Sequence, residues 1–226
     1  MPAERLRTVL QRIQNAADAA GRPVPALLAV SKTQPAAAVA ALAAAGQAAF
    51  GENYVQEGAA KRAALAAAHP GLHWHLIGHL QSNKAAQAAE AFDWVQSVDR
   101  PGLVAALARH RAPQRGPLNV LIQVNVEGEA GKAGCRPEDL PALADRVADT
   151  PGLALRGLMS IPVPHPDPER RRPAFRRMRE LFDGLAARHP GADTLSMGMS
   201  DDFAIAIAEG ATLVRIGTAL FGPRPR

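Results

Sequence analysis

The sequence predicts an α/β protein, a single (β/α)8 TIM barrel with an extra N-terminal helix. Short apolar runs alternate with longer alanine-rich helical patterns along the 226 residues, which is typical of βαβ units with a parallel sheet. There are eight such runs, as in a closed (β/α)8 barrel. An open, doubly wound sheet is the alternative, but no GxGxxG motif follows the first run, where Ser31, Lys32 and Thr33 stand instead.

The elements follow one another without a linker rich in glycine or serine. An amphipathic helix is expected over about residues 3–20, before the first strand. The strand candidates are 25–32, 48–53, 72–78, 93–99, 118–126, 153–162, 194–200 and 212–222. Helical patterns between them include 36–46, 54–68 and 172–189, and the proline-containing stretch 162–170 is predicted to be a loop. We therefore expect one domain over residues 1–226 and, since the chain ends soon after the last predicted strand, no second domain.

The charge pattern disfavours nucleic-acid binding. The formal net charge is +5, but aromatic residues make up only 4% of the chain, which weakens any prediction of base stacking. Six arginines crowd one short stretch: Arg170, Arg171, Arg172, Arg176, Arg177 and Arg179. They alternate with apolar residues at helical spacing, which favours an amphipathic helix with a solvated basic face. A basic nucleic-acid module is kept only as a third hypothesis.

Cysteine content and the N-terminus indicate a cytoplasmic protein. Cys135 is the only cysteine, so no internal disulfide and no cysteine cluster for a metal is expected. The first twenty residues carry charges throughout and lack the apolar centre of a signal peptide. No segment has the apolar length of a membrane span.

Lys32 is the first candidate functional residue, because it is one of only four lysines beside twenty-two arginines. A desolvated lysine amine can lose its proton and form an imine with a carbonyl, which an arginine does not do. Lys32 follows the apolar run 27–30, so its amine is expected to emerge where a buried strand ends. A solvated lysine at a strand end is the alternative.

Polar residues, glycines and one methionine also lie near the carboxyl ends of most of the other predicted strands, at the barrel face that carries the active site in this fold. They are Glu52, Asn53, Gly78, His79, Asn125, Met159, Ser160, Ser200, Gly217 and Thr218. Ser200 precedes the helical pattern 201–209, while Gly217 and Thr218 follow the eighth strand. Phosphate sites after the seventh and eighth strands recur in such barrels. Taken singly, Ser200 is better explained as an N-cap and Gly217 as a turn residue. Their joint placement favours a phosphate site.

Arg215 is expected to face the same side of its strand as Gly217, two residues later. An arginine that stays protonated can donate to an aromatic nitrogen and keep that nitrogen unprotonated. An imine-forming lysine, a phosphate site and such an arginine together describe a site for pyridoxal 5'-phosphate (PLP). A salt bridge from Arg215 to a nearby carboxylate is the alternative.

The chain resembles the pyridoxal phosphate homeostasis protein family, also described as proline synthetase co-transcribed homologues. The motifs that carry the resemblance are LLAVSKTQP (27–35), FGENYVQE (50–57), WHLIGHLQSNK (74–84), GKAG (131–134), GLMSIP (157–162), SMGMSDDFAIAIAEGAT (196–212) and VRIGTALFG (214–222). They cover nearly the whole chain, in order. The resemblance implies a fold-type III barrel like the N-terminal domain of alanine racemase, with PLP as cofactor.

The same resemblance implies roles for individual residues. Lys32 matches the lysine that holds PLP as a Schiff base, and Arg215 matches the arginine facing the pyridine nitrogen. The phosphate contacts match Ser200, Gly217 and Thr218, and the pocket motifs contain Asn53, Met159 and Ser160. No metal ligand and no catalytic residue is implied.

Three further positions fall in the motifs or depart from them. Lys84 and Lys132 occupy motif positions. Two interpretations are open, auxiliary sites that receive or pass on the cofactor and ordinary surface charge, and we favour surface charge. Gln34 stands where some relatives place a further lysine, so a transfer route beginning there is in doubt.

The resemblance implies a carrier that holds PLP reversibly for vitamin B6 homeostasis and cofactor supply, with no enzymatic turnover. Racemisation needs acid and base groups on both faces of the substrate carbon, and nothing marks Tyr54, the single tyrosine, as a second base. An arginine at the ring nitrogen also weakens the electron sink. A weak PLP-dependent racemase or lyase is the alternative. The expected partners are PLP and, transiently, apo-enzymes that need it, with no nucleic acid, no membrane and a monomeric state.

Overall fold

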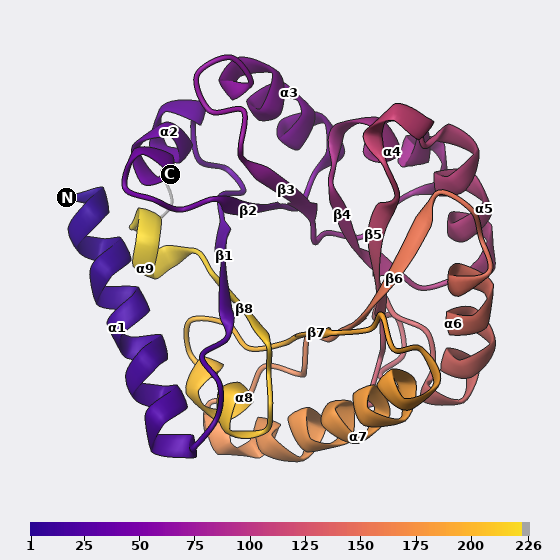
Figure 1. Ribbon diagram of the computed structural model, residues 1–226. Helices are drawn as coiled ribbons and strands as arrows, with labels where there is room; N and C mark the ends of the chain where they lie inside the picture. The colour runs from indigo at the N-terminus through magenta and orange to yellow at the C-terminus, as the bar shows by residue number, and fades with distance from the viewer. Residues whose placement is uncertain (223–226) are drawn as a thin grey trace.

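A computed structural model describes residues 1–222, which form a closed barrel of eight parallel strands in sequence order, ringed by helices (Figure 1). The strands are β1 (Ala26–Val30), β2 (Ala49–Glu52), β3 (His73–Leu76), β4 (Trp94–Val98), β5 (Leu118–Gln123), β6 (Leu153–Met159), β7 (Thr194–Ser196) and β8 (Leu213–Ile216). Pairing of β1 with β8, from Ala26 opposite Leu213 to Ala29 opposite Ile216, closes the barrel. The predicted barrel is confirmed and the open-sheet alternative is wrong.

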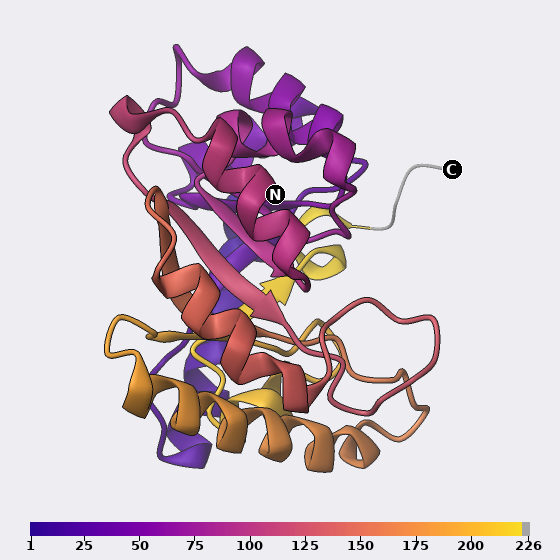
Figure 2. The ribbon, with the colours of Figure 1, turned by 90° about the vertical axis from the view of Figure 1, so that its right-hand side faces the viewer.

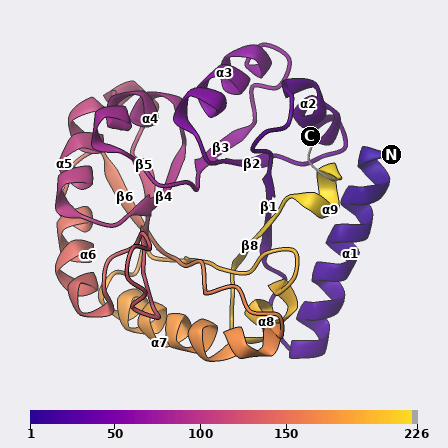
Figure 3. The same ribbon diagram turned by 180° about the vertical axis from the view of Figure 1, so that it is seen from behind.

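The helices lie outside the strands in both face-on views (Figure 3). The α-helices are α1 (Pro2–Ala20), α2 (Ala36–Ala44), α3 (Val55–Leu65), α4 (Ala85–Ala91), α5 (Pro101–His110), α6 (Leu140–Ala148), α7 (Arg172–Arg188), α8 (Phe203–Ala208) and α9 (Thr218–Phe221). Short 3-10 helices are η1 (Ser82–Lys84), η2 (Pro113–Arg115), η3 (Pro137–Asp139) and η4 (Pro168–Arg171). The α-helices alternate with the strands, as the sequence predicts.

Helix α1 is the predicted extra element, and it covers the side of the barrel where the sheet closes. Its buried residues, Leu6, Val9, Ile13 and Ala17, recur at intervals of three and four, so one stripe faces inward. The helix packs on α8 and α9, and in Figure 1 it runs alongside them. It ends at Gly21, whose φ of 59° suits a left-handed C-cap.

Two predicted boundaries shift in the last third of the chain. The run 212–222 divides into β8 and α9, because the chain turns at Gly217. Helix α8 begins at Phe203, two residues later than the pattern 201–209 indicates, with Asp202 at its N-cap. The Asp202 side chain makes no capping hydrogen bond to the helix. Its carboxylate accepts a hydrogen bond from the Met199 amide at 2.6 Å and pairs with Arg171 at 2.6 Å. Ser200 is therefore not the N-cap of α8.

Strand β6 departs from regular pairing at Gly157. Its register against β5 shifts between Val120 and Leu121, and Gly157 has a φ of 139°. A Cβ there would lie 2.0 Å from the Thr194 carbonyl oxygen of β7, so only glycine allows the two backbones to approach this closely. Because of this irregularity, strict alternation along the sequence does not fix the direction of side chains at the end of β6.

The loops after β5 and β6 project from the same end of the barrel (Figure 2). The Val163 amide donates to Glu127 Oε2 at 2.6 Å, which joins the two loops, and Arg171 donates to the His165 carbonyl at 2.9 Å. The predicted loop 162–170 is thus irregular up to η4 and is tied at both ends.

The basic stretch at 170–179 is largely neutralised by carboxylates. Its ion pairs are Arg171 with Asp202, Arg172 with Glu169 and Glu209, Arg176 with Glu209, Arg177 with Glu180 and Arg179 with Asp183. On α7 the apolar side chains, including Phe175, Met178 and Phe182, are buried. The amphipathic helix is confirmed.

Within residues 1–222, no helix is long and apolar enough to cross a membrane. The same residues contain no group of three or more His, Cys, Asp or Glu side chains that could hold a metal ion.

Candidate functional site

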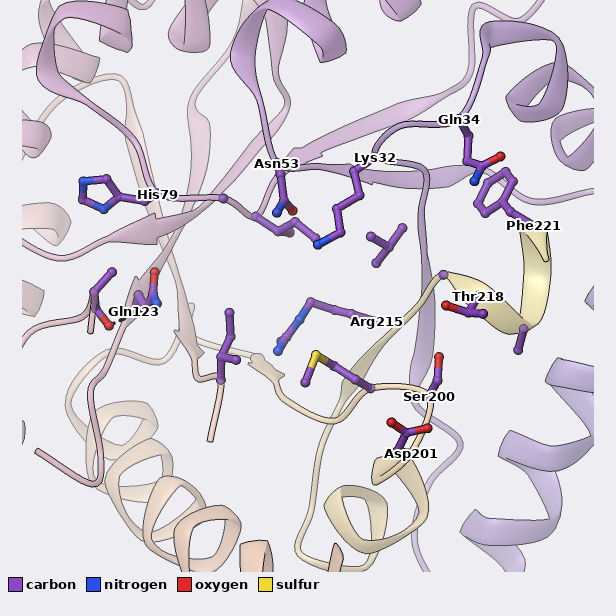
Figure 4. Close-up of a pocket in the computed structure, with 18 of the residues that line it drawn as sticks. Lys32, Gln34, Asn53, His79, Gln123, Ser200, Asp201, Arg215, Thr218 and Phe221 are labelled. Carbon is purple, nitrogen blue, oxygen red and sulfur yellow. Dashed lines mark hydrogen bonds between the residues drawn. The ribbon is translucent and has the colours of Figure 1, made fainter. Parts of the chain in front are cut away.

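A cavity of about 1030 Å³ opens at the carboxyl ends of the strands. Its lining includes six of the predicted site residues: Lys32, Asn53, Ser200, Arg215, Gly217 and Thr218. Figure 4 shows the Lys32 amine and the Arg215 guanidinium pointing toward the same central space, with Ser200 and Thr218 to one side. The cavity therefore combines a lysine amine, hydroxyl donors and a buried arginine, brought together from both ends of the sequence.

The segment that carries Lys32 is held from beneath by a buried lysine, Lys61 of α3. Its ammonium donates to the Ser31 carbonyl at 2.6 Å, to Glu52 Oε1 at 2.8 Å and to Glu57 Oε1 at 2.7 Å. Glu57 Oε1 also accepts from the Thr33 amide at 2.6 Å. Both peptide groups that flank Lys32 are thus fixed.

The backbone at Thr33 is strained, since its φ is 64°, the one positive value at a non-glycine residue among residues 1–222. A β-branched residue is rarely found in this region, so the surrounding contacts must hold it there. The bond from its amide to Glu57 is such a contact. The strained turn directs the chain away from β1 immediately after Lys32.

Glu52 is the buried centre of this cluster. Its Oε1 accepts from the Ser31 hydroxyl at 2.6 Å as well as from Lys61. Burial raises the pKa of Glu52, although the hydrogen bonds from Lys61 and Ser31 act in the opposite direction. The carboxylate thus depends on these two donors to remain charged inside the protein.

Replacing Lys61 with methionine should destabilise the fold by about 3 kcal/mol, because it leaves Glu52 buried without its cationic partner. The free energy of unfolding from urea denaturation measures the effect. Lys84→Met in η1 is the matched control, and we expect it to cost less than about 0.5 kcal/mol. Equal losses in the two variants would contradict a structural role for Lys61.

Arg215 of β8 is almost wholly buried, with 4% of its surface exposed. Its guanidinium donates to the Ser196 hydroxyl at 2.7 Å and to the Ser160 carbonyl at 2.8 Å. Burial lowers the pKa of Arg215 to about 10, against the opposing effect of Asp202, so it remains protonated at neutral pH. Among residues 1–222 it forms no salt bridge, and the alternative of a carboxylate partner is wrong.

Ser200, Gly217 and Thr218 lie together at one side of the cavity. Ser200 belongs to the loop between β7 and α8, and Thr218 begins α9 directly after Gly217. A Cβ on Gly217 would lie 3.1 Å from the Val30 carbonyl oxygen, so glycine lets this turn pack against the end of β1. The arrangement places two hydroxyl groups and nearby backbone amides where an anion can bind.

The other predicted pocket residues divide into two groups. Asn53 lines the cavity, and its carbonyl packs so closely on Gly78 that a Cβ on Gly78 would lie 2.1 Å away. Met159 and Ser160 are fully buried and are not among the lining residues. Ser160 instead contacts Arg215 through its carbonyl.

The auxiliary lysines also lie in different places. Lys132 lines the cavity and pairs with Glu129, so it is not simply a surface charge. Lys84 lies in η1 and is not a lining residue. Gln34 and His79 line the cavity as well.

Several lining residues were not predicted from the sequence, among them the polar residues Arg12 and Gln123. Arg12 is an exposed residue of α1 whose guanidinium lies 5.1 Å from the centre of the Phe203 ring. Because α1 precedes the barrel, no local pattern indicates that it reaches the mouth. Gln123 is the last residue of β5. The predicted strand 118–126 extends past it, so the sequence indicated Asn125 as the polar residue at this strand end.

Comparisons with known proteins show which family the chain is similar to. Residues 5–225 match the family model for the alanine racemase N-terminal domain. The pyridoxal phosphate homeostasis protein of Pseudomonas aeruginosa is 56% identical, with 98% of this chain and 95% of the relative covered, and that of Escherichia coli is 49% identical, with 98% and 96% covered.

Solved structures extend the similarity to the fold. PipY of Synechococcus elongatus, in a structure with PLP bound, has a TM-score of 0.86 and 39% identity, covering 98% of this chain and all of that chain. Alanine racemase of Corynebacterium glutamicum has a TM-score of 0.71 at 19% identity, covering 100% of this chain and 61% of the racemase, a likeness of fold alone.

Proposed function

This chain belongs to the pyridoxal phosphate homeostasis protein family, and from that premise we propose that it holds PLP as a reversible Schiff base on Lys32 and serves intracellular vitamin B6 homeostasis. The observation that carries the proposal is the convergence of Lys32, Arg215 and the hydroxyls of Ser200 and Thr218 on one cavity. A relative with 39% identity has a structure with PLP bound. The residue assignments are our proposal for this chain.

The donor set of the cavity fits PLP. When bound, PLP supplies an aldehyde, to which a lysine amine can add and from which it can be released. We propose that Ser200, Gly217 and Thr218 bind the phosphate, while Asn53 bounds the pocket near Lys32. We propose that Met159 and Ser160 support the cavity lining from the protein interior, where both are buried.

Arg215 fits the pyridine nitrogen of PLP. Its hydrogen-bond acceptors, the Ser196 hydroxyl and the Ser160 carbonyl, are neutral groups, and within residues 1–222 it forms no salt bridge with a carboxylate. Its protonated guanidinium can donate to the ring nitrogen and leave that nitrogen without a proton. An unprotonated ring withdraws electrons weakly, which favours holding the cofactor over amino-acid turnover.

The weak-racemase alternative needs a second acid or base in the cavity. Tyr54 has 62% of its surface exposed and is not a lining residue. His79 lines the cavity and lies 3.9 Å from Asp99, so it is the one observation that favours the alternative.

We expect the purified protein to retain PLP on equilibrium dialysis and to leave amino acids unchanged. The experiment incubates the loaded protein with each L-amino acid and measures D-isomer and keto acid by chiral chromatography, beside free PLP at the same concentration. Loss of PLP on dialysis would contradict the binding proposal. Product formation well above the free-cofactor rate, removed by His79→Gln, would support the enzyme instead.

The remaining parts of the proposal concern location and partners. We propose a cytoplasmic monomer that forms one PLP-binding unit over residues 1–226, of which 223–226 lie outside the described residues. Cys135 is buried and burial raises the pKa of its thiol to about 12, so it suits a reducing compartment without taking part in redox chemistry. Transient contact with apo-enzymes, without nucleic acid or membrane as partners, completes the proposal.

A further inference from the structure

A buried chain of polar side chains runs from Arg215 through the barrel interior. Arg215 Nη1 donates to Ser196 Oγ at 2.7 Å, and Ser196 Oγ lies 2.7 Å from Gln96 Oε1. Gln96 Nε2 lies 3.0 Å from His75 Nδ1. The four residues come from β8, β7, β4 and β3, and each has at most 4% of its surface exposed.

The hydrogens of these three hydrogen bonds have one consistent order. Arginine can only donate, so Ser196 accepts from Arg215 and gives its own hydrogen to Gln96 Oε1. The Gln96 amide then donates to His75 Nδ1, which must be neutral with its hydrogen on Nε2. The opposite amide orientation would aim two donors at Ser196 and leave the serine hydrogen without an acceptor in the chain.

His75 is fixed at the far end of the chain. Its ring stacks on Trp94, with the ring centres 5.0 Å apart and the planes 7° from parallel. The titratable groups that act on it are Asp93, directly before β4, and His73, the first residue of β3. Asp93 is itself paired with Arg62 and Arg115. Among residues 1–222, Gln96 is the hydrogen-bond partner of the His75 ring.

Barrel interiors of this fold are filled mainly by branched apolar side chains, so a polar chain across this one calls for an explanation. Buried polar groups cost free energy unless every one of them is hydrogen-bonded. Ser196 and Gln96 link β7 with β4, which are not neighbours in the sheet. This chain of hydrogen bonds gives the buried Arg215 guanidinium a neutral acceptor, the Ser196 hydroxyl, in a fixed orientation.

We propose that Ser196, Gln96 and His75 are positioning residues that hold the Arg215 guanidinium against the pyridine nitrogen of PLP as a donor only. The inference rests on the proposed function. Since every link donates away from Arg215, no group in the chain delivers a proton toward the ring nitrogen. The chain therefore keeps that nitrogen unprotonated over a wide range of pH.

The test compares Ser196→Ala and Gln96→Met with Ser196→Thr, which keeps the hydroxyl. Ser97→Ala is the matched control. Ser97 is a buried serine on the same strand as Gln96, and its hydroxyl has no hydrogen-bond partner among residues 1–222. For each protein, a spectroscopic titration gives the Kd for PLP, the absorption spectrum of bound PLP is followed against pH, and the melting temperature of the apo-protein is recorded.

We expect Ser196→Ala and Gln96→Met to bind PLP roughly tenfold more weakly and to show a pH-dependent spectrum at neutral pH. Ser196→Thr and Ser97→Ala should match the wild type in both. If the wild type binds PLP but Ser196→Ala and Gln96→Met show the same Kd and the same spectra as the wild type, this inference alone is overturned. It is also overturned if Ser97→Ala loses as much affinity and melting temperature as Ser196→Ala and Gln96→Met do. Failure of the wild type to retain PLP would overturn the proposed function itself.

Discussion

Lys32→Ala should abolish covalent attachment of PLP, because the Lys32 amine points into the central space that Arg215 also faces. The other lysine of the cavity lining, Lys132, is paired with Glu129. Borohydride reduces an imine to a stable amine, so reduction of the loaded wild type followed by peptide mass mapping should place one pyridoxyl group on Lys32. In Lys32→Ala the mapped adduct and the imine absorbance should both disappear. Contacts of Ser200, Thr218 and Arg215 should leave weaker, reversible binding.

Two controls separate attachment from loss of the fold. Lys32→Arg keeps a positive charge but cannot form the imine, so it should also lose the adduct while its melting temperature stays near that of the wild type. Lys84→Ala removes a lysine outside the cavity lining and should keep the full adduct. A pyridoxyl group mapped to Lys132 in the wild type would contradict the assignment of Lys32.

The second large effect concerns acid stability through His75. Burial lowers the pKa of His75 from its ordinary value of 6.5 to about 3, with Asp93 opposing the change and His73 adding to it. Between these two pH values the unfolded chain binds a proton at His75 and the folded chain does not. The free energy of unfolding should therefore fall as pH decreases from 6.5 to 3, by up to about 5 kcal/mol.

Because carboxylates titrate in the same range, the measurement needs a matched variant. His75→Gln keeps an acceptor for Gln96 but cannot be protonated, so its stability should decline less steeply between pH 6.5 and 4 in urea denaturation. Lost stacking on Trp94 should lower its stability equally at every pH. Parallel curves for the two proteins would contradict neutral burial of His75.

Much of the architecture could be predicted from local patterns. Each strand is a short apolar run that ends in a polar or glycine residue, and each helix a longer amphipathic or alanine-rich stretch, so period and composition are sufficient to locate them. The predicted boundaries fail where tertiary contacts override the pattern. Asp202 binds Arg171 and the Met199 amide, which delays α8, and Gly217 turns the chain into α9.

The predicted site residues met different outcomes for a related reason. Lys32, Asn53, Ser200, Gly217 and Thr218 follow strand ends, and all strand ends of a parallel barrel meet at one face, so topology alone brings them together. Met159 and Ser160 also lie at a strand end, yet both are buried outside the cavity lining, past the irregular pairing at Gly157. A register shift of this kind has no clear signal in the sequence.

The sequence by itself determined the barrel, the family and most of the predicted residues at the mouth, because these depend on local periodicity and on motifs read along the chain. Only the tertiary structure decided that Lys61 fixes the turn at Lys32, that Lys132 and Arg12 reach the cavity, and that Arg215 is hydrogen-bonded to Ser196. Such contacts join residues far apart in sequence, and their directions depend on barrel closure and register, which no single segment encodes.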